Sequence, residues 1–229
     1  MGLLEQHQAE RRGRILAAAR RLIAAHGYDG LTMRELARES RVSVPTLYNL
    51  FGGKRALLLG ELEETFAAVA TAVEQARGTS FVERALAACD AGNRDLLAVP
   101  RYTRELVHLF LVSEETRPLR RATADRYIAM MMSILAEGQA AGDVAAWVDP
   151  AVLARRMFAH YEHTMIQWAQ EELDAEGFQA ATRFGMCVML RAVARGGAAR
   201  ELERCLPVVQ AELRPGTAAR RRSRARKGG

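Results

Sequence analysis

Two short helices with closely spaced start signals constrain the fold more than any other feature of this chain. Thr32 and Glu35 form a capping box, in which the Thr32 hydroxyl accepts a hydrogen bond from the backbone N–H of Glu35. Ser43 is the next N-cap, and Pro45 in the following turn sits where a missing N–H costs nothing. Because only a four-residue turn separates the two helices, they must pack at a steep angle, which predicts a helix-turn-helix motif.

The second helix of this motif, Val44 to Leu50, is predicted to be the recognition helix, with its N-terminal end towards the bases of a DNA duplex. An earlier helix, from about Gln8 to His26, carries an apolar stripe at helical spacing and should close a three-helix domain. The stripe consists of Ile15, Leu16, Ala19, Leu22 and Ile23. Arg11, Arg12 and Arg14 precede it, either as a solvated face or as contacts to phosphate.

The sequence of this region resembles the N-terminal domain of the TetR family of repressors over about residues 10 to 60. The resemblance rests on Ile15-Leu16-x-x-Ala19, Gly27-Tyr28, Leu31-Thr32, Leu36-Ala37, Val42-Ser43, Pro45-Thr46-Leu47-Tyr48, Phe51 and Lys54-Arg55-Ala56-Leu57. Two positions depart from the family pattern. Arg41 stands in the turn where Gly is usual, and at a positive φ it would cost about 1 kcal/mol. Leu50 stands where His is common.

The resemblance implies a set of DNA-binding residues at matching positions. They are Arg34, Ser43, Val44, Pro45, Thr46, Tyr48, Asn49 and Lys54. Arg34 suits guanine or phosphate, Val44 and Pro45 suit a thymine methyl group, and Lys54 at a helix start suits a phosphate. The alternatives are a solvated face for Arg34 and a partly buried aromatic for Tyr48.

Composition predicts an all-helical protein in which basic N-terminal and C-terminal segments flank an acidic central segment, residues 61–213. The chain is rich in Ala, Leu, Arg and Glu and shows no sustained two-residue alternation. Residues 1–60 hold ten Lys or Arg against five Asp or Glu, and residues 214–229 hold seven basic residues and no acid. This asymmetry is typical of a chain that meets a polyanion with part of its surface. The tail should be disordered, and it either attracts DNA or merely affects solubility.

The two helices near residues 150–172 and 178–194 are the expected dimer surface. The second of them is apolar on much of its circumference and needs cover on two sides, which a second subunit could supply. Its apolar residues are Phe184, Met186, Val188, Met189, Leu190 and Val193. In the family that this chain resembles, these two helices form a four-helix dimer interface. The alternative is a central helix of a monomeric bundle.

Aromatic and methionine residues in the central part of the chain predict an apolar ligand pocket between the helices expected at about residues 54–77 and 150–172. The candidate lining residues are Phe66, Tyr102, Leu106, Phe110, Tyr127, Met131, Phe158, Tyr161 and Met165. Each of these side chains could equally be ordinary core. Since nothing in the sequence identifies the ligand, its role is a hypothesis: it binds a conformer whose recognition helices are misplaced for DNA.

Other chemistry finds little support in the sequence. His160 and His163, with His108 as a possible third ligand, are weak indications of a metal site, and we predict no metal, no cofactor and no catalytic residues. The three cysteines have no metal-binding spacing and are an odd count, which favours a reducing cytoplasm. No apolar run approaches a membrane span, and the N-terminus has no signal-peptide core.

The sequence therefore predicts an all-α protein with a helix-turn-helix DNA-binding domain over residues 1–53 and a ligand-binding and dimerisation domain over residues 54–213. Residues 214–229 form the basic tail. The predicted function is a homodimeric, cytoplasmic transcriptional regulator that binds a near-palindromic operator in double-stranded DNA as a repressor released by a small, mainly apolar effector. The alternatives are a DNA-binding regulator without a small ligand, or a helical enzyme or carrier with a vestigial motif.

Overall fold

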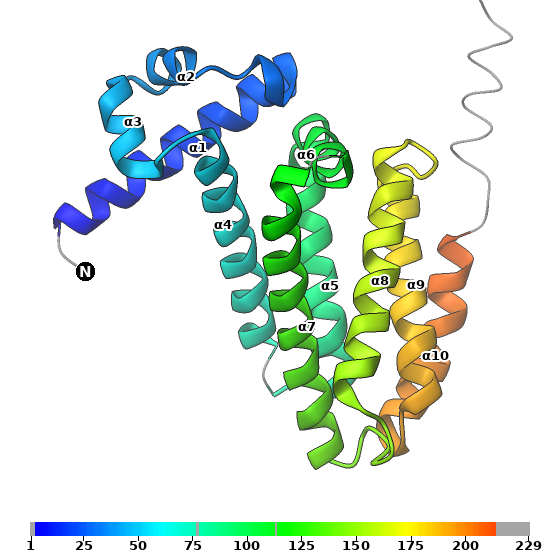
Figure 1. Cartoon of the computed structure of the whole chain (residues 1–229). Helices are drawn as coiled ribbons and strands as arrows, with labels where there is room; N and C mark the ends of the chain where they lie inside the picture. Colours follow the sequence, from blue (N-terminus) through cyan, green and yellow to red (C-terminus); the bar gives the residue numbers. More distant parts are fainter. Residues whose placement is uncertain (1–2, 77, 113, 214–229) are drawn as a thin grey trace, which may run out of the picture. The chain divides into compact units, whose positions relative to one another are not determined.

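The computed structural model describes residues 3–76, 78–112 and 114–213, and their secondary structure is helical apart from one isolated bridge between Val144 and Ala194 (Figure 1). The predicted all-α class is confirmed. The helices are α1 (Leu3–Gly30), α2 (Met33–Ser40), α3 (Val44–Phe51), α4 (Lys54–Gln75), α5 (Phe81–Ala98), α6 (Pro100–Val112), the short 3-10 helix η1 (Glu114–Thr116), α7 (Arg117–Ala140), α8 (Pro150–Ala169), α9 (Ala175–Val193) and α10 (Gly196–Glu212).

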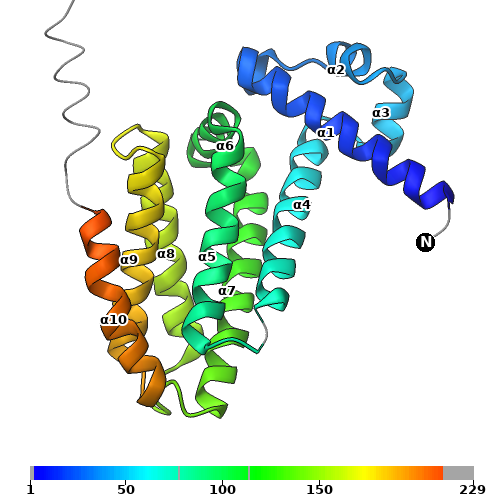
Figure 2. The same ribbon diagram turned by 180° about the vertical axis from the view of Figure 1, so that it is seen from behind.

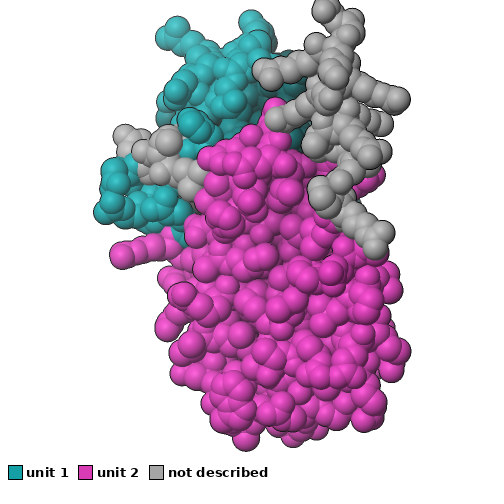
Figure 3. All heavy atoms as spheres, turned by 90° about the vertical axis from the view of Figure 1, so that its right-hand side faces the viewer, with its two compact units in different colours: residues 1–68, 94–120 teal, residues 69–93, 121–229 magenta. Residues whose placement is uncertain are grey.

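The chain divides into two compact units, which Figure 3 distinguishes by colour. Unit 1 combines residues 1–68 with residues 94–120, and unit 2 combines residues 69–93 with residues 121–229. Unit 1 therefore contains α6 as well as the three N-terminal helices. The sequence-based boundary after residue 53 stays a prediction.

The core of unit 1 gathers the apolar stripe of α1 against α2, α3, the start of α4 and α6. Ile15, Leu16 and Ile23 of α1 are almost wholly buried, as the helical spacing predicted. Tyr102 and Leu106 of α6 belong to the same core. Burial of this stripe favours one fixed arrangement of the three N-terminal helices, because apolar area removed from water stabilises only that packing.

Both predicted N-caps of the helix-turn-helix are confirmed. The Thr32 hydroxyl accepts from Glu35 N at 3.1 Å, and the Ser43 hydroxyl accepts from Thr46 N at 3.2 Å. Arg41 ends α2 in the left-handed conformation, with φ 55° and ψ 46°. Gly52 ends α3 at φ 73°. Each helix of the motif therefore begins and ends at a locally determined residue, which fixes the turn between them.

In unit 2, α9 packs against both α8 and α10, and the three helices run side by side in Figures 1 and 2. Asp149 caps α8 by accepting from Ala151 N at 2.8 Å, and Pro150 follows it in the first turn, which is a common start of a helix. Ser80 and Glu83 cap α5 reciprocally, with Glu83 N donating to Ser80 Oγ at 3.0 Å and Ser80 N donating to Glu83 Oε2 at 3.2 Å.

Two residues that commonly interrupt helices lie inside helices of this protein. Proline removes a backbone hydrogen bond and usually ends or kinks a helix, but α10 continues through Pro207. Leu202 and Val209 on either side of Pro207 are buried, so packing holds the helix despite the lost hydrogen bond. Glycine is a common break in helical sequences, but Gly92 lies inside α5. A Cβ atom there would stand 3.0 Å from the Tyr161 hydroxyl oxygen, so the glycine makes room for that side chain.

Candidate nucleic-acid interface

Helix α3 is anchored on one side and open on the other. Leu47 and Phe51, one turn apart, are buried in the core of unit 1. Pro45 and Asn49 are exposed, and half of the Tyr48 surface is accessible. Because residues three or four apart share a helix face, the buried pair turns the remaining side chains of α3 outwards.

The other predicted DNA-binding residues divide into exposed and half-buried side chains. Arg34 and Ser43 are exposed, whereas Val44 and Thr46 are half-buried. Val44 packs against the core of unit 1, and the Thr46 hydroxyl lies 2.7 Å from that of Ser43. These contacts hold the N-terminal turn of α3 in place. The roles of these residues towards DNA stay predictions.

Lys54 is engaged within the protein. Its ammonium group lies 4.2 Å from the centroid of the Tyr28 ring, and Nζ donates to the backbone carbonyl of Asp29 at 3.4 Å. Partial burial lowers the pKa of Lys54, and the nearby Asp29 carboxylate opposes that shift. Lys54 therefore joins the start of α4 to the segment after the break at Gly27 in α1.

The N-terminal arginines of α1 differ in their surroundings. The Arg12 guanidinium lies 4.8 Å from the centroid of the Phe51 ring. It also occupies the space beside Gly60 that a larger side chain would need. Arg14 is exposed. Arg12 is thus part of the packing of unit 1, while Arg14 remains available to an external anion.

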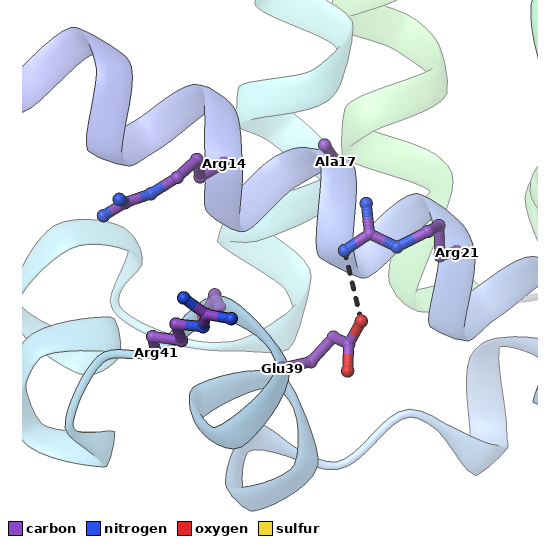
Figure 4. Close-up of a pocket in the computed structure, with 6 residues that line it drawn as sticks. Arg14, Ala17, Arg21, Glu39 and Arg41 are labelled. Atoms are coloured by element: carbon purple, nitrogen blue, oxygen red, sulfur yellow. Dashed lines mark hydrogen bonds and ion pairs between the residues drawn. The ribbon is translucent and has the colours of Figure 1, made fainter.

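A basic cleft of about 370 Å³ lies between α1 and the end of α2 (Figure 4). Its lining residues are Arg14, Ala17, Arg21, Glu39, Ser40 and Arg41. Arg21 Nη2 donates to Glu39 at 3.2 Å, so this pair is internally neutralised. The side chains of Arg14 and Arg41 lie on the side of the cleft away from this ion pair. The cleft therefore carries excess positive charge two residues before the N-cap of α3.

Sequence reasoning missed Arg41 and Arg21 as candidate site residues. The only signal for Arg41 was an arginine in place of the expected glycine, which could have been read as functional rather than as a departure. The cleft itself depends on how α1 crosses α2, and this crossing is a tertiary feature that no local pattern encodes.

The predicted ligand-lining residues fall in both units. Tyr102, Leu106 and Phe110 pack in or against the core of unit 1. Those in unit 2 are Tyr127, Met131, Phe158, Tyr161 and Met165, of which Tyr127, Met131 and Tyr161 are buried. The side chain of Phe66 lies outside the described residues. The pocket and its lining stay predictions.

Aromatic rings form a continuous group inside unit 2. The Tyr127 ring centroid lies 5.4 Å from that of Phe158 and 5.6 Å from that of Tyr161. Phe178 lies 6.2 Å from Tyr161 and 5.6 Å from Trp168. Phe178 and Trp168 were not among the predicted lining residues. Their burial in α9 and α8 makes them core partners of the predicted site.

The histidines suggested as metal ligands have other surroundings. His160 Nε2 lies 3.2 Å from the carbonyl oxygen of Ala181, across the contact between α8 and α9. His163 is exposed, and His108 belongs to unit 1. Among the described side chains, no three potential metal ligands come together. None of the helices within the described ranges has the length and hydropathy that crossing a bilayer requires.

The capped, outward-facing α3 on its three-helix core defines a helix-turn-helix protein. Residues 15–60 match the sequence-family model of bacterial regulatory proteins, tetR family. The chain is also 26% identical over 161 residues to the HTH-type transcriptional repressor KstR of Rhodococcus jostii, which covers 70% of this chain and 74% of KstR. Over residues 15–60 the chain is therefore similar to the bacterial regulatory proteins of the tetR family.

Solved structures share the fold over most of the chain. A TetR-family regulator from Syntrophomonas wolfei superposes with a TM-score of 0.69 at 18% identity, covering 80% of this chain and 95% of that one. A TetR-family regulator from a Rhodococcus species gives a TM-score of 0.65 at 23% identity, covering 80% and 99%. The fatty acid degradation regulator FadR of Bacillus halodurans gives 0.66 at 20% identity, covering 79% and 94%.

Proposed function

We propose that the protein is a repressor that binds a near-palindromic operator as a homodimer and leaves it when a small, mainly apolar effector binds the C-terminal helices. The observation that carries the DNA-binding part is the outward face of α3, held by the buried Leu47 and Phe51 and by the Ser43 cap. A helix fixed in this way can enter the major groove without losing the conformational entropy of ordering itself.

The charge around this face supports contact with a polyanion. Arg14 and Arg41 bring excess positive charge to the basic cleft, and Arg34 is exposed on α2. Such groups supply sequence-independent attraction to phosphates, while the side chains of α3 read the bases. Tyr48 and Asn49 are the exposed polar residues of α3 that we expect to make direct contacts.

Homodimerisation through α8 and α9 is supported by exposed apolar side chains on both helices. Val152 of α8 is 54% exposed and Val188 of α9 is 45% exposed. Each is a large apolar side chain on a helix whose opposite face is already buried within the subunit. A second copy of the chain would cover them, and two-fold symmetry would then place two α3 helices about 34 Å apart along the duplex.

Repression is supported by the name of a relative, since KstR is named a transcriptional repressor, and FadR is titled a regulator of fatty acid degradation. The proposed relief by an effector is supported by the aromatic group of unit 2, which offers an apolar environment. The effector acts only if it prefers a conformer that cannot place both recognition helices on one operator.

Selection of bound sites from random duplex DNA with the full-length protein tests this proposal. The expected outcome is one enriched motif made of two inverted half-sites, with centres about 10 base pairs apart. Asn49→Ala should reduce enrichment of the motif while leaving weak, salt-sensitive binding to any duplex. Recovery of no motif, or of single half-sites only, would contradict sequence-specific binding by a symmetric dimer.

A further inference from the structure

Three buried side-chain polar atoms of unit 2 have no hydrogen-bond partner among the described residues. One is Nε of Arg84, whose guanidinium is paired with Glu137, and the two uncharged ones are Oδ1 of Asn93, in α5, and the hydroxyl oxygen of Tyr127, in α7. Asn93 is 1% exposed and Tyr127 is 7% exposed, so solvent does not satisfy either atom. Buried polar groups in proteins are nearly always paired, and an unpaired one asks for an explanation.

The orientation of the Asn93 amide follows from its neighbour Thr182. The Thr182 hydroxyl donates to the carbonyl oxygens of Phe178 and Gln179, at 2.9 and 3.0 Å. Its oxygen must therefore accept from Asn93, whose Nδ2 lies 2.7 Å away. Because the amide nitrogen is fixed on Thr182, Oδ1 points elsewhere and remains a free acceptor.

Tyr127 supplies the complementary donor. Burial raises the pKa of its hydroxyl well above the ordinary value, and the neighbouring Cys89 and Tyr161 act in the same direction, so the group keeps its proton. The ring is held between Phe158 and Tyr161. One uncommitted acceptor and one uncommitted donor thus lie in the same apolar interior.

Cys89 and Tyr161 lie beside the two groups. Cys89 Sγ lies 3.8 Å from Asn93 Nδ2. The Tyr161 ring stacks on Tyr127, and its hydroxyl oxygen lies 3.0 Å from the Cβ position of Gly92, which precedes Asn93 in α5. Burial raises the pKa of the Cys89 thiol to about 12, so it is neutral. Asp90 and Arg183, whose charges act on the Cys89 thiol, are paired with each other at 2.6 Å. Asn93, Tyr127 and Cys89 are therefore polar groups without charge.

We infer that Asn93 and Tyr127 form the polar anchor of the effector site, and that the effector is a mainly apolar molecule with an uncharged hydroxyl group. The effector hydroxyl accepts from the Tyr127 O–H and donates to Asn93 Oδ1. This inference rests on the proposed function and deepens it by naming the chemistry of the effector. A carboxylate would bring its negative charge against the Asn93 acceptor, and a ketone could satisfy only Tyr127.

The test measures binding of 1-decanol, 2-decanone and decanoate to the full-length protein by calorimetry. We expect 1-decanol to bind best, 2-decanone to bind more weakly and decanoate not to bind. Asn93→Leu should weaken 1-decanol about tenfold and leave 2-decanone unchanged. Tyr127→Phe should weaken both by about tenfold, because it removes the donor that they share.

Thermal unfolding of the same variants separates an anchor from a structural role. Tyr127→Phe should leave Tm unchanged or raise it by about 2 °C, since it removes an unsatisfied buried group. The control Thr164→Val removes a satisfied buried hydroxyl, which donates to His160 O at 2.9 Å. It should lower Tm and leave 1-decanol binding unchanged.

Preferential binding of decanoate, 1-decanol binding that ignores both substitutions, or no binding of any of the three compounds would overturn the anchor. Operator binding by the same preparation, measured separately, distinguishes this failure from failure of the proposed function. If the protein selects its inverted repeat but binds none of the three compounds, the proposed DNA-binding function is retained and the Asn93–Tyr127 anchor is ruled out.

Discussion

At the scale of single residues, we expect Arg41 to link stability to DNA recognition. Its left-handed backbone, with φ 55°, is unfavourable for any residue with a Cβ atom, and its guanidinium lines the basic cleft. A chain that keeps an arginine in this conformation stores strain next to the N-cap of α3. Strained residues gather at functional sites, where the rest of the structure holds them in place.

Arg41→Gly should therefore stabilise the protein and weaken its binding to DNA. Relief of the backbone strain is worth about 1 kcal/mol, or roughly 2–4 °C in Tm. Loss of one phosphate contact should lower the slope of log K against log salt by about one unit. Arg204→Ala, which removes an exposed charge from α10, is the control and should change neither quantity. If Arg41→Gly leaves the salt slope unchanged, Arg41 does not contact a DNA phosphate through this cleft.

At the scale of elements, the contact between α8 and α9 depends on a glycine. A Cβ atom on Gly185 would collide with the imidazole of His160. We expect Gly185→Ala to destabilise the protein by about 1–2 kcal/mol, although alanine favours helices more than glycine does. Chemical denaturation measures this change. His160→Ala should restore most of the loss in the double variant, and equal stability of wild type and Gly185→Ala would show that the imidazole moves aside freely.

Local signals explain what the sequence could predict about these elements. The caps at Thr32, Ser43 and Asp149 each involve residues within four positions, so their spacing is enough to identify them. The positions of Pro207 and Gly92 inside helices could not be predicted from local sequence, because they depend on packing against other helices. The same reason accounts for the basic cleft and for the Asn93–Thr182 contact, which joins residues 89 positions apart.

At the scale of the whole molecule, the proposed function depends on pairing two copies. Val188→Glu should convert the protein to a monomer and reduce operator affinity by at least 100-fold, because one helix-turn-helix reaches only half of the site. Light scattering after size-exclusion chromatography measures the mass. Val208→Glu, at a 61% exposed position on α10, is the matched control and should stay dimeric. Monomers from Val208→Glu, or dimers from Val188→Glu, would move the interface to another helix.

Unit 1 draws its core from two separate parts of the chain, and this has a consequence during synthesis. Leu22 and Leu31 are already translated when α3 emerges, but Tyr102 and Leu106 follow only after residues 69–93 have been made. The nascent N-terminal helices must wait for α6 before their apolar surface is fully covered. A nascent chain stalled before residue 100 would therefore have an incompletely packed helix-turn-helix domain. We expect a fragment that ends at residue 60 to expose the same apolar surface and to be bound by chaperones or degraded by proteases.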